Sequence, residues 1–335
     1  FVLYISFRLK INITKMKKKY IYISIVAIMP LLTILSIVSF KTPQKNLLTS
    51  SLIVNIIPDF PAKVEWGGER VDLDRFDMRE RYDRELTSFC YMHSNTLLIL
   101  KRANRYFPLI EPILKKNGIP EDFIYLAAIE SYLNPRAVSP AKAAGLWQLL
   151  PSTAKEAGLE VNDYVDERFN IEKSTEAACR YLKSAYAKYG SWTTVAASYN
   201  AGMGRISKEL AKQQHDSSFD LWLNEETSRY VFRALVLKEI LKDPYRFGFA
   251  VRKHQLYHPV RVQEIMVNTP IEDLTVFAKN HGITYAQLKE FNSWLRDRSL
   301  PNKNGKTYKI LIPEKKDLYY STRQIPVYNK KWTID

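Results

Sequence analysis

The chain has 335 residues, of which 46% are hydrophobic and 25% are charged. These proportions are typical of a globular protein and exclude a chain that is disordered or fibrous throughout. Lys and Arg number 50 against 35 Asp and Glu, so the net charge is +15, which favours an anionic partner such as nucleic acid, acidic lipid or an acidic wall polymer. Because the chain contains no HExxH, CxxC, GxGxxG or P-loop motif, we expect neither a metal nor a cofactor.

An uncharged, apolar run at residues 20–40 directly follows three lysines at 17–19. About 20 apolar residues suffice to cross a bilayer core as a helix, and the preceding positive charges predict that the rest of the chain lies outside. The run is long for a cleaved signal peptide and lacks a small-residue cleavage site. We therefore favour an uncleaved membrane anchor over a cleaved signal. Met16 stands before the lysines, so residues 1–15 are interpreted as an extension without function.

Helical patterns dominate residues 72–241 and predict a helical domain. Apolar residues recur at helical spacing most clearly in residues 79–104, 172–189 and 226–241. We expect Ser174 or Thr175 to cap the second of these helices and Gly190 to end it. After Phe249 the pattern changes to strand, two short helices and strand, which predicts a small β-α-α-β module.

Two cysteines, Cys90 and Cys179, are too few to define a disulfide scaffold. Cys179 follows two alanines in a predicted helix, where a small buried side chain is the simplest interpretation. We therefore expect two free, buried thiols, and a disulfide between them is the alternative.

A predicted helix with a single charged side chain precedes Pro135. From Phe123 to Leu133 every residue is apolar, aromatic or small except Glu130 and Ser131, so we expect a buried helix that ends before the proline. Burial raises the pKa of a carboxyl group, and a glutamic acid that stays protonated near neutral pH can act as the general acid in glycosidic cleavage. Without further context, a buried glutamate paired with Arg or Lys is the commoner interpretation.

Three further motifs follow Glu130-Ser131 along the chain. They are Gly145-Leu146-Trp147-Gln148, Ser198-Tyr199-Asn200-Ala201-Gly202, and Glu226-Thr227 with Tyr230-Val231. Their amide, phenol and aromatic groups suit a sugar site, because hydroxyls need hydrogen bonds and ring faces need stacking. In this order the motifs resemble the catalytic domain of soluble-type lytic transglycosylases, and Trp147 together with residues 66–86 is most similar to the family's membrane-bound members. The resemblance covers about residues 60–245.

This resemblance implies a mainly helical, goose-type-lysozyme-like domain that cleaves the β-1,4 bond between MurNAc and GlcNAc in peptidoglycan. Glu130 matches the catalytic residue, and Ser131 and Tyr230 match residues that support it. The family's substrate contacts are matched by Gln148, Tyr199, Asn200, Trp147 and Gly145. The chain departs from the family at Lys142, where a small residue is usual, and at Ser198, where Ala is usual.

The mechanism implied by the family uses one carboxyl group. Glu130 protonates the bridging oxygen, the C6 hydroxyl of MurNAc attacks C1, and the ionised Glu130 takes up the released proton, so a 1,6-anhydroMurNAc end forms without water. Two-carboxylate glycosidases place their acids about 5–9.5 Å apart; residues 145–148 and 198–202 hold no second acid, although Glu226 or Asp163 could fold near the site.

Three other functions compete with this prediction. A muramidase would hydrolyse the same bond, and a catalytically inactive scaffold would only bind peptidoglycan. A nucleic-acid binder is suggested by the positive charge, but the predicted export and the lack of a recognition motif argue against it. We therefore expect the glycan strands of peptidoglycan as the partner and no nucleic acid.

Residues 267–314 resemble a LysM module, a small binder of N-acetylglucosamine polymers. The opening departs from that family, since Ile271-Glu272-Asp273-Leu274 replaces Gly-Asp-Thr-Leu, and a purely structural βααβ appendage is the alternative. A second glycan site on one chain would raise the effective concentration of substrate at the first.

The predicted organisation places the protein in the bacterial cell envelope, on the periplasmic side and anchored to the inner membrane, or in the periplasm if the signal is cleaved. In chain order we expect an extension (1–15), a signal anchor or signal peptide (16–41), a linker (42–60), the catalytic domain (61–250), a connector (251–266), the LysM-like module (267–314) and a tail (315–335).

Overall fold

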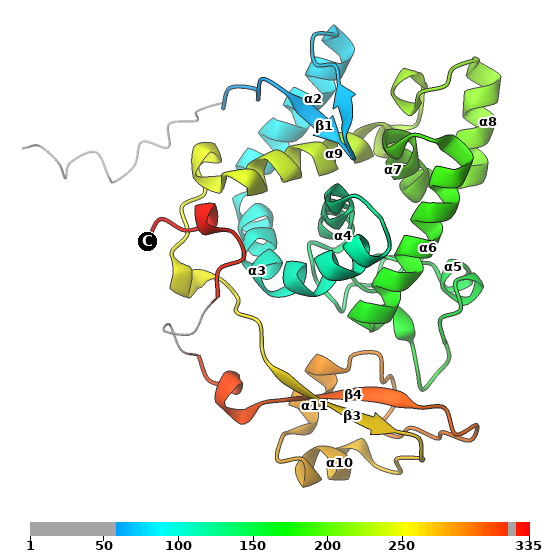
Figure 1. The fold of residues 1–335 in the computed structure, drawn as a ribbon, viewed down its shortest axis with the longest axis vertical. Helices are drawn as coiled ribbons and strands as arrows, with labels where there is room; N and C mark the ends of the chain where they lie inside the picture. Colours follow the sequence, from blue (N-terminus) through cyan, green and yellow to red (C-terminus); the bar gives the residue numbers. More distant parts are fainter. Residues whose placement is uncertain (1–57, 321–325) are drawn as a thin grey trace, which may run out of the picture. The chain divides into compact units, whose positions relative to one another are not determined.

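A computed structural model describes residues 58–320 and 326–335 (Figure 1). The main helices are α2 (Phe76–Tyr91), α3 (His93–Lys116), α4 (Ile124–Ser131), α5 (Pro151–Glu156), α6 (Ile171–Tyr189), α7 (Trp192–Ala201), α8 (Met203–Gln213), α9 (Glu225–Lys242), α10 (Leu274–Asn280) and α11 (Tyr285–Phe291). Two antiparallel pairs of strands join them, β1 (Val64–Trp66) with β2 (Glu69–Val71) and β3 (Val262–Val267) with β4 (Tyr308–Pro313).

The fold class predicted from the sequence is confirmed, because the described chain is mainly helical and ends in a β3-α10-α11-β4 module. The apolar run at residues 20–40 lies outside the described residues. Among the residues that are described, no helix is both long and apolar enough to span a membrane. Cys90 and Cys179 are free and buried, as expected.

Helix α9 lies at the centre of the helical domain and packs against α2, α4 and α7. Its apolar side chains are buried along most of its length, and even Lys238 is almost fully enclosed. The ammonium of Lys238 donates to Asp122 and to the carbonyl of Glu65, each at 2.7 Å. A buried charge needs such partners, and these bonds connect α9 to β1 and to the residues that precede α4.

Helix α4 ends earlier than the sequence predicts. Tyr132 and Leu133 both adopt left-handed backbone angles, with φ of 51° and 53°, although such angles cost non-glycine residues about 1–2 kcal/mol each. The surrounding structure stabilises this turn, because the side chain of Leu133 is fully buried in the core and Arg102 donates a 2.9 Å hydrogen bond to the carbonyl of Tyr132. Glu130 therefore lies in the last turn of α4, beside a sharp change of chain direction.

Two other details of the predicted helices differ. The pattern over residues 79–104 forms two helices, since the chain leaves helical geometry at Met92. Asn170 caps α6 by accepting from Lys173 N, whereas the hydroxyl groups of Ser174 and Thr175 donate to a carbonyl inside the helix. The predicted end of α6 at Gly190 is confirmed by its left-handed φ of 64°.

The β3-α10-α11-β4 module shares a hydrophobic core with the helical domain. Val165 and Phe169, which precede α6, pack in one cluster with Trp294 and Leu295 of the module. Backbone hydrogen bonds cross the same boundary, with Asp166 N donating to the Trp294 carbonyl at 2.8 Å. The module is therefore built onto the loop between α5 and α6.

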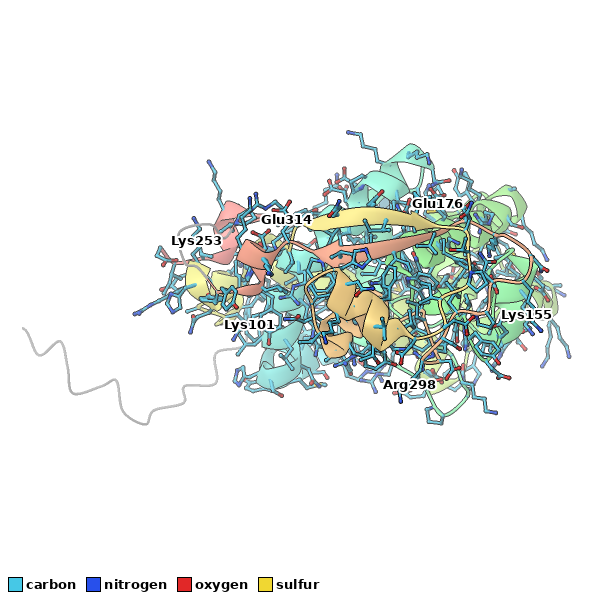
Figure 2. All side chains as sticks on the ribbon, turned by 90° about the horizontal axis from the view of Figure 1, so that it is seen from below. Lys101, Lys155, Glu176, Lys253, Arg298 and Glu314 are labelled. Carbon is cyan, nitrogen blue, oxygen red and sulfur yellow. The ribbon has the colours of Figure 1, made fainter. Side chains whose placement is uncertain are left out.

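Basic side chains are distributed over the surface of the described residues. Lys155 and Arg298 lie apart from Lys101 and Lys253 in Figure 2, and the side chains of Lys155 and Arg298 are exposed. Basic side chains thus lie at more than one place on the surface, which fits a general attraction to anionic polymers.

Candidate active site

The carboxyl group of Glu130 accepts a 2.6 Å hydrogen bond from the hydroxyl of Tyr230 on α9. Burial raises the pKa of Glu130 to about 7, although the Tyr230 hydrogen bond and the positive charge of Arg233 act to lower it. The negative charge of Glu226 raises this pKa further. A carboxyl group with a pKa near 7 can both donate and accept a proton in one cycle at neutral pH.

Replacing Tyr230 with Phe is expected to shift the alkaline limb of the pH–rate profile upward. The Tyr230 hydroxyl stabilises the ionised form of Glu130, so its removal raises the pKa of Glu130 above about 7. The protonated acid then persists to higher pH, while the maximal rate falls because the carboxyl group loses its orienting hydrogen bond. A pH profile of glycan cleavage measures this, and an unchanged alkaline limb would contradict the assigned contact.

Ser131 lies next to Glu130 but bonds elsewhere. Its hydroxyl donates to the carbonyl of Ala127 at 3.0 Å and is buried. Within the described part of the chain no hydrogen bond joins it to the Glu130 carboxyl group. Any support that Ser131 gives to Glu130 therefore acts through the end of α4.

Gln148 closes the loop that lies between α4 and α5. The residue has a positive φ of 47°, and its side-chain amide donates to the carbonyls of Ala137 and Gly145 at 3.2 and 2.9 Å. The backbone amides of Ala144 and Leu149 bond to each other's carbonyl oxygens. These contacts fix the loop and leave the amide oxygen of Gln148 as its acceptor group.

The side chain of Trp147 points into the core of the helical domain. The indole is fully buried and donates from Nε1 to the hydroxyl of Thr175 at 2.9 Å. Its carbonyl accepts a 2.8 Å hydrogen bond from the hydroxyl of Tyr199. The ring fills the core beneath the loop and packs edge-to-face against the ring of Tyr199, with the two ring centroids 6.3 Å apart.

The backbone at Gly145 packs so closely against a neighbouring segment that only glycine fits. Its φ is 77°, and a Cβ atom at this position would overlap the carbonyl oxygen of Arg168. Gly145 is itself buried, so it holds the loop closely against the segment before α6.

Gly145→Ala is expected to destabilise the protein by about 2–4 kcal/mol, through overlap with backbone added to the strain of a positive φ. Gly158→Ala is the matched control, because Gly158 has a φ of 80° but no atom within 4 Å of the place that a Cβ would take. The control is expected to lose only about 1–2 kcal/mol. Urea unfolding measures both variants, and equal losses would exclude the packing contact.

Tyr199 and Asn200 lie at the end of α7, where the ring of Tyr199 packs against Trp147 and Tyr181 and the side chain of Asn200 bonds to α9. Burial and the nearby Glu130 hold the pKa of Tyr199 well above its usual value, so this phenol stays protonated as a donor. The side-chain Oδ1 of Asn200 accepts a 2.8 Å hydrogen bond from the Thr227 hydroxyl, and its Nδ2 donates to Glu226 at 3.4 Å. The motifs at 198–202 and 226–231 therefore meet beside Glu130.

Of the two further acids considered from the sequence, Glu226 lies near enough to affect the pKa of Glu130. Asp163 is exposed in the loop before α6, where the neighbouring Tyr164 carbonyl accepts from Arg296 N of the module.

Arg233 was not predicted from the sequence as a residue of the site. It follows Tyr230 by about one helical turn, and its positive charge lowers the pKa of Glu130. Its helical spacing from Glu226 and Tyr230 was the available signal.

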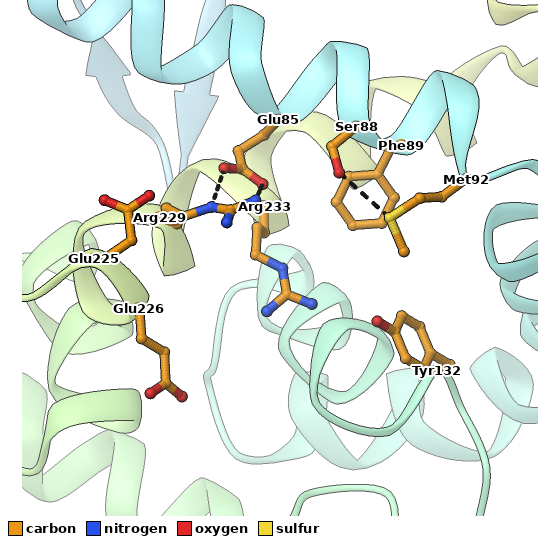
Figure 3. Close-up of a pocket in the computed structure, with 9 residues that line it drawn as sticks. All are labelled: Glu85, Ser88, Phe89, Met92, Tyr132, Glu225, Glu226, Arg229 and Arg233. Atoms are coloured by element: carbon orange, nitrogen blue, oxygen red, sulfur yellow. Dashed lines mark hydrogen bonds and ion pairs between the residues drawn. The ribbon is translucent and has the colours of Figure 1, made fainter.

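A pocket of about 430 Å³ opens next to this group (Figure 3). Its walls come from α2, the end of α4 and the first half of α9. The lining residues are Glu85, Ser88, Phe89, Met92, Tyr132, Glu225, Glu226, Arg229 and Arg233. The arrangement can supply a proton from Glu130, hydrogen bonds from phenol and amide groups, and charged contacts from α9.

Two segments of the chain match known protein families. Residues 108–221 match the family described as the transglycosylase SLT domain, and residues 263–316 match the soluble lytic transglycosylase C-terminal LysM-like domain. Membrane-bound lytic murein transglycosylase D of Escherichia coli (strain K12) is 32% identical over 243 residues, which cover 71% of this chain and 52% of that protein. The chain thus spans about half the length of this relative.

More distant relatives are also similar. Membrane-bound lytic murein transglycosylase F of Idiomarina loihiensis is 28% identical over 204 residues, covering 57% of this chain and 42% of that protein. The crystal structure of the 70 kDa soluble lytic transglycosylase of Escherichia coli is 22% identical, with a TM-score of 0.37, and covers 48% of this chain and 30% of that chain. On the sequence matches, the chain contains a transglycosylase SLT domain followed by a LysM-like domain of the soluble lytic transglycosylase type.

Proposed function

We propose that this protein is a peptidoglycan lytic transglycosylase. It cleaves the β-1,4 bond between MurNAc and GlcNAc without water and leaves 1,6-anhydroMurNAc ends. The observation that carries the proposal is Glu130 with a pKa of about 7, hydrogen-bonded to Tyr230, within a chain segment that matches the SLT domain.

Glu130 acts first as an acid and then as a base. In its protonated form it gives its proton to the bridging oxygen, so the bond from C1 of MurNAc to that oxygen breaks. The C6 hydroxyl of the same MurNAc attacks C1, and its proton passes to the ionised Glu130, which restores the enzyme. Tyr230 orients the carboxyl group through its 2.6 Å hydrogen bond. The amide oxygen of Gln148 and the side-chain amide of Asn200 offer hydrogen-bonding groups to the sugars. Tyr199, whose hydroxyl donates to the Trp147 carbonyl, keeps its oxygen as an acceptor.

The product distinguishes this reaction from hydrolysis. Purified sacculi are incubated with the full chain in detergent, and the released muropeptides are analysed by mass spectrometry beside Glu130→Gln. We expect muramyl ends that are lighter than reducing ends by one water, and their loss in the variant. Reducing ends would instead identify a muramidase, with Glu226 as the first candidate for a second acid because its charge reaches Glu130.

The substrate also suggests where the protein works. We propose the periplasmic side of the bacterial cell envelope, with residues 20–40 as an uncleaved anchor in the inner membrane, and the relatives named as membrane-bound transglycosylases support this. Residues 61–250 form the catalytic domain, and residues 267–314 form a LysM-like module that binds the same polymer. Cell fractionation, with detection of an intact N-terminal tag in the membrane fraction, tests the anchor against a cleaved signal.

A further inference from the structure

The pocket beside Glu130 contains charges of both signs, and most of them already have partners. Glu85 is fully buried and accepts from Arg229 at 2.7 and 3.2 Å through both carboxylate oxygens. Glu225 pairs with Arg84 at 2.7 Å. These pairs hold the wall of the pocket together, so their charges are not free for a ligand.

Arg233 differs from the other charged residues of the pocket. Its only hydrogen bond is a 3.5 Å contact from Nη2 to the carbonyl of Ile129, and within residues 58–320 and 326–335 no carboxylate lies within ion-pair distance. Figure 3 shows its guanidinium pointing into the open space between Glu226 and Tyr132. A guanidinium has five N–H donors in a planar fork that matches a carboxylate.

The remaining walls favour a ligand larger than a single carboxylate. Phe89, Met92 and the ring of Tyr132 line one side, and a volume of about 430 Å³ lies in the range of pockets that hold organic ligands. Glu226 offers a negative charge across the pocket from Arg233. The site therefore suits a flexible substituent that has a carboxylate, apolar carbon atoms and a cationic group.

We propose that this pocket is a subsite for the carboxylate-bearing substituent of the muramyl residue bound next to Glu130, and that Arg233 makes the anionic contact. The inference rests on the proposed function, because only a glycan with muramyl residues brings such a group to this place. The carboxylate has two sources: the lactyl group itself in bare strands, or the stem peptide attached to it. The size and the apolar walls of the pocket favour the peptide.

Binding to the full chain carrying Glu130→Gln tests this without turnover. The ligands are three soluble strands of equal length: peptide-bearing glycan, the same glycan after an amidase has removed the peptides, and a chitooligosaccharide that has no carboxylate. Arg233→Met in this background is expected to weaken binding of the peptide-bearing strand by about tenfold or more. Binding of the chitooligosaccharide should stay unchanged.

Arg180→Met is the matched control, since Arg180 is exposed on α6 and, in the part of the chain that the structure describes, bonds only to the carbonyl of Ala157. Loss confined to the peptide-bearing strand supports the peptide as ligand, and equal loss with the peptide-free strand supports the lactyl carboxylate. An equal change for all three ligands, or none, would overturn the proposal. Because the readout is binding, a wild-type protein that yields no anhydro ends would refute the proposed function separately.

Discussion

Glu130→Gln is expected to lower the rate of glycan cleavage by about 10²–10⁴-fold while making the folded protein more stable above pH 7. The amide cannot donate or accept the proton that the reaction needs. The effect on stability has the opposite sign because burial raises the pKa of Glu130 to about 7, so the folded wild-type protein resists ionisation of this group.

The pH window follows from this pKa. An exposed glutamate in the unfolded chain ionises near pH 4.3, so the wild-type protein loses stability as the pH rises from there to about 7, and the full loss persists at higher pH. Because part of the Glu130 surface remains exposed, we expect Glu130→Gln to gain about 1–3 kcal/mol at pH 8. At pH 4 the two proteins should be nearly equal in stability.

Urea unfolding at pH 4 and pH 8, together with cleavage rates on sacculi, measures both effects. Glu121→Gln is the control, because Glu121 is exposed at the start of the same segment, and neither its activity nor its stability should change. A variant at Glu130 that loses activity and stability together would indicate a misfolded site and would contradict the burial of this carboxyl group.

Arg168→Met is expected to destabilise the protein by about 3–5 kcal/mol, the usual effect of breaking a buried ion pair. Arg168 pairs with Asp166 at 2.7 Å, and both side chains are only 9% exposed. The same guanidinium donates to the carbonyls of Lys142 at 2.6 Å and Leu149 at 3.1 Å. The substitution therefore leaves a buried carboxylate and two loop carbonyls without their donor.

Arg75→Met provides the matched change at an exposed pair. Arg75 contacts Asp77 and Asp220 but is 43% exposed, so we expect a loss of at most about 1 kcal/mol. Thermal or urea unfolding of the two variants compares them directly. If the free energy of unfolding falls by the same small amount in both variants, the Asp166–Arg168 pair does not stabilise the loop that carries Gln148.

The helices were predictable where local periodicity decides the structure. The stretches 172–189 and 226–241 became α6 and α9 almost as expected, because their apolar residues repeat along one face. The β1–β2 hairpin was missed, although Gly67 and Gly68 between short apolar segments form a two-residue turn signal. The left-handed pair after α4 could not be predicted, since burial of Leu133 and the bond from Arg102 depend on tertiary packing.

At the candidate site, too, some features could be predicted from the sequence and others depend on tertiary packing. The motifs that include Glu130 and Tyr230 were recognisable, and the structure brings these two side chains into contact. The sequence could not reveal that the indole of Trp147 points into the core. It also gave no sign that Arg233 has no carboxylate partner among the described residues while Arg229, one turn away, is paired with Glu85, because α2 supplies that partner from a distant part of the chain.

The hydrophobic core that joins Val165 and Phe169 to Trp294 and Leu295 determines how the LysM-like module would contribute to the proposed function. A binding module on a flexible linker can take many positions and orientations relative to the catalytic domain. A module that is built onto the chain before α6 keeps one orientation, so a strand held by both parts would enter the cleft in a fixed register. Lengthening the connector at residues 251–266 would then leave the position of the module relative to the helical domain unchanged.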